Sequence, residues 1–274
     1  TESMYYSVLD LIRRQNGMII LNGPAGSGKT TTILAFLNEL AGPNKKIITA
    51  EDPIERRLPY INHVQVTDKC GFAELSRSYM RQDADIIFIG EIRDAASAIT
   101  AVQLAQTGHL VLTTIHTRDS IGVVSRLQAF DIHANFIADT LIGSLAQRLV
   151  LGLCPYCKLE YQPDPRIIQN ISKILPPPEN THYFQEGPGC EKCIERINGE
   201  IVMKGSMGLV PIFELLFVDS EVQEAINRNK SRIEIREIAR NKGMTNLAEE
   251  ALLRVYQGYI DLKSVYGSIF SPRD

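Results

Sequence analysis

The residues at positions 23–30 have the types and spacing of a phosphate-binding loop. They match the pattern G-x-x-x-x-G-K-T, whose defined positions are Gly23, Gly28, Lys29 and Thr30. Glycines allow a tight loop whose N–H groups converge on a polyphosphate, and the helix that follows adds its partial positive charge. In this pattern the lysine reaches the β and γ phosphates and the threonine hydroxyl ligates Mg²⁺. The residues expected to bind ATP are Gly23, Pro24, Ala25, Gly26, Ser27, Gly28, Lys29, Thr30 and Thr31, with Thr30 as the Mg²⁺ ligand.

Three further side chains suited to phosphoryl transfer follow short apolar runs. Glu51, Glu91 and His116 each stand directly after such a run or one residue later. Phosphoryl transfer needs a lysine for phosphate charge, a carboxylate that orients or deprotonates a water, and acidic groups that hold Mg²⁺. An acidic residue after a strand is more often a helix N-cap, which remains the alternative for each carboxylate.

The apolar runs indicate how these side chains are brought together. The four runs cover residues 18–21, 47–50, 86–89 and 110–115. Their continuous rather than alternating hydrophobicity is typical of parallel strands that are covered on both faces, and they alternate with helical stretches such as residues 31–40. This order predicts a doubly wound α/β fold, in which ligands bind beyond the carboxyl ends of the strands. Lys29, Glu51, Glu91 and His116 are therefore expected to meet at one edge of the sheet.

Four cysteines form a second candidate site. Cys154 and Cys157 make one C-x₂-C pair, and Cys190 and Cys193 make another. Two such pairs offer the four thiolates that structural Zn²⁺ prefers. Disulfides are the poorer explanation in a reducing compartment, and free thiols remain the alternative. The intervening segment contains three consecutive prolines and little apolar periodicity, so a metal would supply order that packing cannot.

Composition limits the possible classes of function. The chain has 274 residues, is 44% hydrophobic, and carries 29 basic against 32 acidic residues, with a pI near 6.0. This charge balance does not favour general electrostatic binding to nucleic acid. No apolar run approaches the roughly 18 residues of a membrane span, and no signal peptide opens the chain, so the cytoplasm is the expected compartment.

The order of the motifs resembles that of a known family. Four segments resemble motifs of the type II secretion and type IV pilus assembly ATPases, the GspE/PilB-like group. They are the Walker A motif at 23–30, the Asp box at 48–55, the Walker B motif at 81–94 and the His box at 107–117. The resemblance implies a RecA-like core and a homo-oligomeric ring of six subunits. It further implies a cytoplasmic motor, peripheral to the bacterial inner membrane, that assembles or extends pilus or pseudopilus subunits or drives type II secretion. The implied partners are an inner-membrane platform and cytoplasmic adaptor proteins, with no nucleic acid.

The same resemblance gives roles to individual residues. It implies that Glu91 is the catalytic Walker B glutamate and that Glu51 is the Asp-box glutamate that helps to activate water. Arg77 and Arg81 match paired arginines ahead of Walker B, and Arg93 and Arg126 also match family positions. A guanidinium from a neighbouring subunit can neutralise charge on the γ phosphate. The alternative for Arg77 and Arg81 is that they form ion pairs on one helix surface.

The sequence predicts three successive segments. Residues 1–150 form a RecA-like ATPase core, residues 151–207 the tetracysteine metal-binding segment, and residues 208–274 a small helical subdomain. The helices expected in the last segment cover residues 221–227, 232–242 and 247–259. Members of this group usually carry another domain ahead of the core, and the chain is expected to be a domain of a longer protein.

Three rival functions remain open from the sequence. A nucleotide switch or adaptor would bind ATP without steady turnover. A RecA-like nucleic-acid translocase would share the core, although the near-neutral charge argues against it. A pilus retraction motor belongs to the same superfamily, but such motors generally lack the tetracysteine segment.

Overall fold

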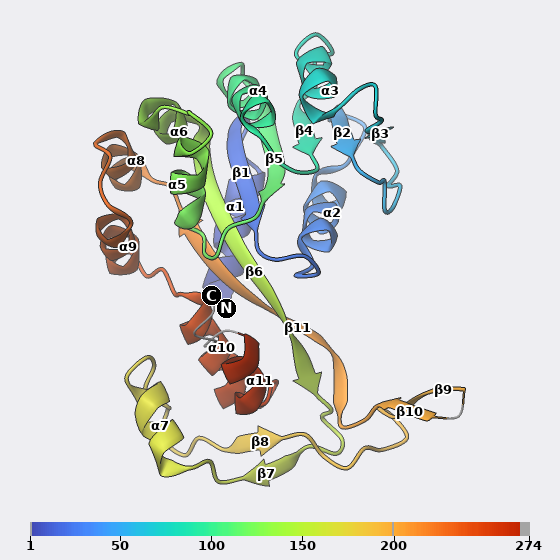
Figure 1. Cartoon of the computed structure of the whole chain (residues 1–274), viewed down its shortest axis with the longest axis vertical. Helices are drawn as coiled ribbons and strands as arrows, with labels where there is room; N and C mark the ends of the chain where they lie inside the picture. Colours follow the sequence, from blue (N-terminus) through green and yellow to red (C-terminus); the bar gives the residue numbers. More distant parts are fainter. Residues whose placement is uncertain (1, 199, 269–274) are drawn as a thin grey trace. The chain divides into compact units, whose positions relative to one another are not determined.

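The computed structural model describes residues 2–198 and 200–268 and divides them into two compact units (Figure 1). The first unit contains the chain up to Ala146 together with Leu215–Met244. The second contains Gln147–Glu214 and the described residues from Thr245 onward. The segment 208–274, which the sequence groups together, therefore contributes to both units.

A seven-stranded sheet forms the centre of the first unit, in the order β11-β6-β1-β5-β4-β2-β3. Strand β1 pairs in parallel with β5 and β6. Strand β4 pairs in parallel with β5 and β2, and β2 pairs in parallel with β3. This parallel pairing confirms the predicted fold class. The strands are β1 (Gly17–Asn22), β2 (Ile47–Glu51), β3 (Ile61–Gln65), β4 (Ile86–Ile89), β5 (Leu110–Ile115), β6 (Leu141–Leu153) and β11 (Ser206–Phe217). Four of these were predicted, and β3, β6 and β11 were not.

Strand β11 corrects the prediction of a purely helical segment after Gly208. The Val218 N–H, just after β11, donates to the Ile142 carbonyl near the start of β6. At the other end, Gly152 of β6 lies against the Met207 carbonyl. The two strands are therefore antiparallel. The sequence from 209 to 217 is rich in Leu, Val, Ile and Phe, which is typical of a strand.

Both faces of the parallel sheet are covered by helices, which explains the continuous apolar runs. In β1, Met18 and Ile20 belong to a core cluster shared with α3, α4 and α6, whereas Ile19 and Leu21 point to the opposite face. The helices of this unit are α1 (Glu2–Ile12), α2 (Lys29–Leu40), α3 (Phe72–Tyr79), α4 (Ala95–Gln106), α5 (Gly122–Gln128), α6 (Ala134–Thr140), α8 (Ser220–Asn227) and α9 (Arg232–Asn241).

The second unit contains the continuations of β6 and β11 and a set of short elements. These are β7 (Leu159–Tyr161), α7 (Pro165–Ser172), β8 (Tyr183–Gln185), β9 (Glu195–Ile197), β10 (Glu200–Met203), α10 (Leu247–Tyr256) and α11 (Leu262–Ser268). Strands β7 and β8 pair with each other, as do β9 and β10. Such small sheets bury little apolar surface by themselves, and helices α10 and α11 add buried side chains such as Leu252, Val255 and Val265.

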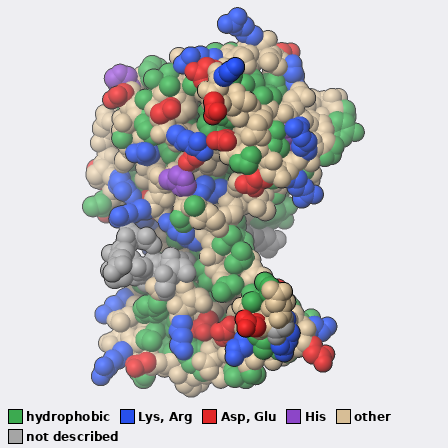
Figure 2. Space-filling model, turned by 45° about the vertical axis from the view of Figure 1, so that its right-hand side comes forward, with side chains coloured by type: hydrophobic (Ala, Val, Ile, Leu, Met, Phe, Trp, Pro, Cys, Tyr) green, Lys and Arg blue, Asp and Glu red, His purple; other side chains and the backbone are tan. Residues whose placement is uncertain are grey.

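The surface carries charges of both signs. On the face shown in Figure 2, basic and acidic side chains are interspersed. Within the described ranges, none of the helices combines the length and apolar character that crossing a bilayer requires.

The central strand β5 gives a test of the fold. Leu112 is 0% exposed and lies between Ile19 of β1 and Phe88 of β4. Leu112→Ala is expected to lower the free energy of unfolding by about 2–5 kcal/mol, because it leaves a cavity in a core that cannot collapse to fill it. Ile99→Ala, on the exposed side of α4, is the control and should change it by less than about 1 kcal/mol. Urea unfolding followed by circular dichroism measures both, and equal losses would contradict the assigned core.

Candidate active site and metal centre

The glycine loop joins the carboxyl end of β1 to the first residue of α2. Gly23, Gly26 and Gly28 have φ angles of 147°, 74° and 82°, a region that favours glycine. The Lys29 ammonium folds back over the loop and donates to the carbonyl oxygens of Gly23 and Pro24, each at 2.9 Å. The Ser27 hydroxyl is buried and has no hydrogen-bond partner among the described residues. Because a buried hydroxyl is costly without a partner, this loop suits an oxygen-rich ligand such as a phosphate.

A cavity of about 240 Å³ opens at this edge of the sheet. Its walls come from the glycine loop and from the segments at the carboxyl ends of β2, β4 and β5. The cavity brings together most residues of the predicted nucleotide site. Those that line it are Ala25, Gly26, Lys29, Thr30, Glu51, Glu91 and His116.

Glu91 lies just beyond β4, and neighbouring backbone holds it in place. The Ile92 N–H donates to the Thr114 carbonyl at 2.9 Å, and the Thr114 hydroxyl donates to the Gly90 carbonyl at 2.7 Å. A Cβ at Gly90 would lie 3.1 Å from the Ala50 carbonyl oxygen, so glycine permits the close approach of β2. The segment that carries Glu91 is thus fixed to strands on both sides.

The Glu91 carboxylate is held by two basic side chains. His116 Nε2 lies 2.9 Å from Glu91 Oε1, and Arg93 Nε donates to Oε2 at 2.7 Å. The other imidazole nitrogen of His116, Nδ1, lies 2.9 Å from the Gly23 carbonyl oxygen. Both ring nitrogens thus face oxygen atoms. His116 therefore links the glycine loop to Glu91.

Arg93 also joins the Walker B segment to the Asp box. Its guanidinium contacts the Asp52 carboxylate at 3.2 Å and lies over the Phe72 ring, 5.5 Å from the centroid. The hydrogen bond to Glu91 raises the pKa of Arg93 above its usual value. Since the Arg93 side chain is 54% exposed, water screens these contacts and they can exchange readily.

Glu51, at the end of β2, has a buried carboxylate. Its Oε1 accepts from the Thr49 hydroxyl at 2.6 Å and lies 2.6 Å from His63 Nδ1. The sequence reasoning missed His63, because strand β3, which carries it, was not predicted. Val64 and Val66 next to it show the apolar alternation that could have indicated this strand.

Arg77 and Arg81 do not line the cavity. Both side chains are exposed, on α3 and just after it, and neither forms an ion pair with a residue in the described ranges. Their role at a neighbouring subunit therefore stays a prediction.

The loop after His116 is anchored to α9 by a cluster of charges. Asp119 accepts from the Gly122 N–H at 2.8 Å, from Arg232 at 2.9 Å and from Arg236 at 2.7 Å. Burial alone would raise the pKa of Asp119, but the Gly122 N–H and the two guanidinium groups outweigh it and hold the pKa below its usual value. Helix α9, far away in the sequence, therefore stabilises the segment that follows His116.

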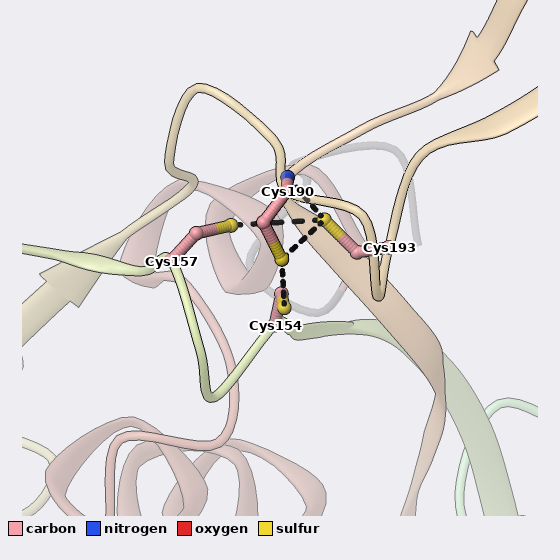
Figure 3. Close-up of side chains that lie close together, drawn as sticks. All are labelled: Cys154, Cys157, Cys190 and Cys193. Carbon is pink, nitrogen blue, oxygen red and sulfur yellow. Dashed lines mark hydrogen bonds between the residues drawn. The ribbon is translucent and has the colours of Figure 1, made fainter.

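Four cysteine side chains of the second unit point toward one another (Figure 3). The Sγ–Sγ distances are 3.8 Å for Cys154–Cys190, 3.6 Å for Cys157–Cys193 and 3.7 Å for Cys190–Cys193. All four ligand atoms lie within 4.8 Å of one another. A tetrahedral metal with metal–sulfur bonds of about 2.3 Å requires sulfur separations of about 3.8 Å. The cluster therefore has the size of a four-thiolate metal site.

Backbone N–H groups support thiolate charge at Cys193, whereas burial and hydrogen bonds to the neighbouring thiols raise the pKa of Cys157. The N–H groups of Cys190 and Gly205 each donate to Cys193 Sγ at 3.3 Å. Burial tends to raise the pKa of Cys193, but these N–H groups outweigh it and bring the pKa to about 7. A Cβ at Gly187 would lie 1.7 Å from the Cys157 carbonyl oxygen, so only glycine lets the two cysteine loops approach this closely.

The fold and the site define a class of protein. A parallel sheet with a glycine loop between β1 and α2, and with carboxylates at the same edge, is a RecA-like P-loop nucleotide-binding core. A family model described as type II/IV secretion system protein matches residues 1–267. The chain belongs to this family.

Known relatives agree with this assignment. The chain is 40% identical over 258 residues to the type IV pilus assembly ATPase PilB of Thermus thermophilus, covering 93% of this chain and 28% of that protein. It is 39% identical over 250 residues to type II secretion system protein E of Dickeya dadantii, covering 90% of this chain and 47% of that protein. The crystal structure of the pilus retraction motor PilT with bound ADP matches with a TM-score of 0.69 at 26% identity, over 97% of this chain and 65% of that one. The chain thus spans about half or less of the length of these two curated relatives.

The Asp119 cluster gives a test that depends on pH. Asp119→Asn is expected to lower the free energy of unfolding at pH 7 by about 1–3 kcal/mol, because two arginines lose a charged acceptor. A carboxyl with a lowered pKa stabilises the fold above its unfolded value, near 3.9, and this contribution is lost as the pH falls through the folded value. The difference between wild type and variant should therefore shrink below pH ~4.

Urea midpoints measured between pH 7 and pH 3 check this prediction. Asp68→Asn, at an exposed position, is the matched control and should leave the midpoints unchanged. A constant difference between wild type and Asp119→Asn at every pH would mean that charge does not account for the effect.

Proposed function

We propose that the chain binds ATP with Mg²⁺ and hydrolyses the γ phosphate as the motor domain of a pilus assembly or type II secretion machine. The observation that carries this proposal is the single cavity that contains Lys29, Thr30, Glu51, Glu91 and His116. These residues come from four separate stretches of the chain, and together they supply the charge, metal ligand and carboxylates that phosphoryl transfer needs. The relative that is named a type IV pilus assembly ATPase supports the same activity.

The proposed roles follow from the contacts. Lys29 exchanges the carbonyl oxygens of Gly23 and Pro24 for phosphate oxygens, and the loop N–H groups and the Ser27 hydroxyl bind the same phosphates. The Thr30 hydroxyl holds Mg²⁺, which when bound neutralises charge on the phosphate oxygens. Glu91, assisted by Glu51, orients the attacking water and accepts its proton. His116 connects Glu91 to the loop and so aligns the carboxylate with the phosphate.

We further propose that the chain works in a homo-oligomeric ring of six subunits. Arg77 and Arg81 are exposed and form no ion pair with the residues that the structure describes, so they are available to a neighbouring copy, where a guanidinium can neutralise developing charge on the γ phosphate. Hydrolysis would then depend on assembly. By similarity to the relatives, the ring would work in the cytoplasm at the bacterial inner membrane, with platform and adaptor proteins of the machine as partners.

The rival functions have less support. The PilT match keeps a retraction motor as the alternative, but the cysteine cluster favours the assembly and secretion branch. A nucleic-acid translocase is disfavoured by the interspersed charges on the face in Figure 2 and by the net charge of −3. A nucleotide switch without turnover differs from a motor in its rate of phosphate release.

The cysteine cluster is proposed to hold one Zn²⁺. Four thiolates at tetrahedral separations match the preference of structural zinc, and no open coordination position is left for chemistry. Zinc would supply a cross-link between two loops that the small β7–β8 and β9–β10 sheets cannot position by packing. Its role is therefore structural.

Two substitutions test the proposed hydrolysis. Lys29→Ala should abolish ATP binding, because it removes the charge that meets the phosphates. Glu91→Gln should still bind ATP but lower kcat by about 10²- to 10⁴-fold, because the base for water is lost. Phosphate release at several protein concentrations and equilibrium binding of a fluorescent ATP analogue measure the two effects.

Lys45→Ala and Glu39→Gln are the matched controls, since both positions are exposed and lie outside the cavity. Both should retain wild-type binding and turnover. Wild-type turnover by Glu91→Gln in an assembled ring would remove Glu91 from the mechanism. DNA-stimulated hydrolysis would favour the translocase instead.

Zinc content tests the proposed metal centre. The purified chain should contain about one zinc ion, measured by plasma mass spectrometry, and a chelator should lower its melting temperature. Cys190→Ser should lose the metal because three thiolates bind it less tightly. Cys70→Ser is the control, as Cys70 lies outside the cluster, and it should keep the metal. A zinc content far below one per chain, or an equal loss in both variants, would contradict the assignment.

A further inference from the structure

We propose that His63 is a positioning residue that holds the Glu51 carboxylate in the orientation needed to activate water. This inference rests on the proposed ATP hydrolysis and adds a residue to it. His63 stands on β3, directly opposite Thr49 in the parallel register with β2. It does not line the cavity, so it acts through Glu51.

The hydrogen bonds of His63 fix its protonation and its direction. The backbone N–H of Leu58 donates to His63 Nε2 at 3.0 Å, so Nε2 is an acceptor without a hydrogen. A neutral imidazole then carries its hydrogen on Nδ1. Nδ1 lies 2.6 Å from Glu51 Oε1, and it therefore donates to the carboxylate. The contact is a hydrogen bond from a neutral imidazole, oriented by the backbone N–H of Leu58.

The geometry leaves one carboxylate oxygen for chemistry. The Thr49 hydroxyl donates to the same Oε1, so both donors hold a single oxygen. Among the described residues, none donates to Oε2, and Glu51 lines the cavity. A carboxylate tethered through Oε1 presents Oε2 to the cavity, where a water can donate to it.

Burial makes this tether rigid. The side chains of His63 and Glu51 are 1% and 2% exposed. The Tyr79 hydroxyl donates to the Thr49 carbonyl at 2.9 Å and ties the same strand to α3. Hydrogen bonds are stronger and more directional away from water. By contrast, Glu91 is 21% exposed and held by exposed side chains, so the two carboxylates differ in mobility.

A purely structural histidine would behave differently from a positioning residue. If His63 only stabilised the pairing of β3 with β2, its loss would lower the free energy of unfolding and leave kcat per folded chain unchanged. If it positions Glu51, its loss should lower kcat with little change in KM for ATP, because the phosphate contacts are made elsewhere. A small misplacement of a reacting group can cost about 10²-fold in rate.

The experiment compares variants in steady-state ATP hydrolysis by the full protein in its assembled form. His63→Leu removes the donor at similar volume and should lower kcat by about 10²-fold. His63→Asn keeps an N–H donor near the Nδ1 position and should recover most of kcat. Val64→Ala, on the same strand but on the opposite face, is the control for lost packing and should retain kcat.

A double-mutant cycle shows whether His63 acts through Glu51. In a Glu51→Gln background, His63→Leu should cause no further loss of kcat, because the group that it orients is already gone. Independent losses that multiply would overturn the proposal. Wild-type kcat in His63→Leu would overturn it as well.

A spectroscopic measurement is independent of activity. With ¹⁵N-labelled histidine, the His63 ring should show a neutral tautomer protonated at Nδ1, and its signal should shift in Glu51→Gln but not in Val64→Ala. A ring protonated at Nε2 would overturn the proposal. If the wild-type protein shows no ATP hydrolysis, the proposed function fails, and this measurement still decides whether His63 holds Glu51.

Discussion

The parallel pairing of β1, β5, β4 and β2 is the constraint on which the site depends. Parallel strands end at the same edge of a sheet, and each of these strands is followed by a polar group that enters one cavity. Residues separated by up to 93 positions thereby come within hydrogen-bond distance, as His116 and Gly23 do. Each of these strands is buried on both faces, so the strand ends that carry the polar groups belong to the packed core.

The basic side chains at this edge of the sheet have oxygen partners that a phosphate could replace. Lys29 bonds to loop carbonyls, and Arg93 spans Glu91 and Asp52, so each basic group already has oxygen partners. A phosphate can replace such partners without leaving a cation unpaired. Arg93 is exposed, so water screens its contacts, whereas Glu51 is buried against Thr49 and His63.

The second unit combines very short strands with a cluster of four cysteines. Its strands β7 to β10 have three or four residues each, too few to bury a substantial apolar face. The four cysteines gather at separations that suit a tetrahedral ion, and Gly187 allows their loops to touch. A metal bound to them would cross-link the two cysteine loops.

The sequence alone determined the glycine loop, the four buried strands and the cysteine pairs, because each depends on short-range spacing or on local hydrophobicity. It also indicated that Glu51, Glu91 and His116 follow strands, which parallel topology turns into proximity. Only the tertiary structure decided the donors around these groups. The register of β3 against β2 brings His63 into contact with Glu51. The path of the chain in three dimensions brings Arg236 of α9 into contact with Asp119. The pairing of β11 with β6 was likewise decided only by the tertiary structure. Such contacts join residues far apart in the chain, and no local pattern encodes the pairing of one strand with another.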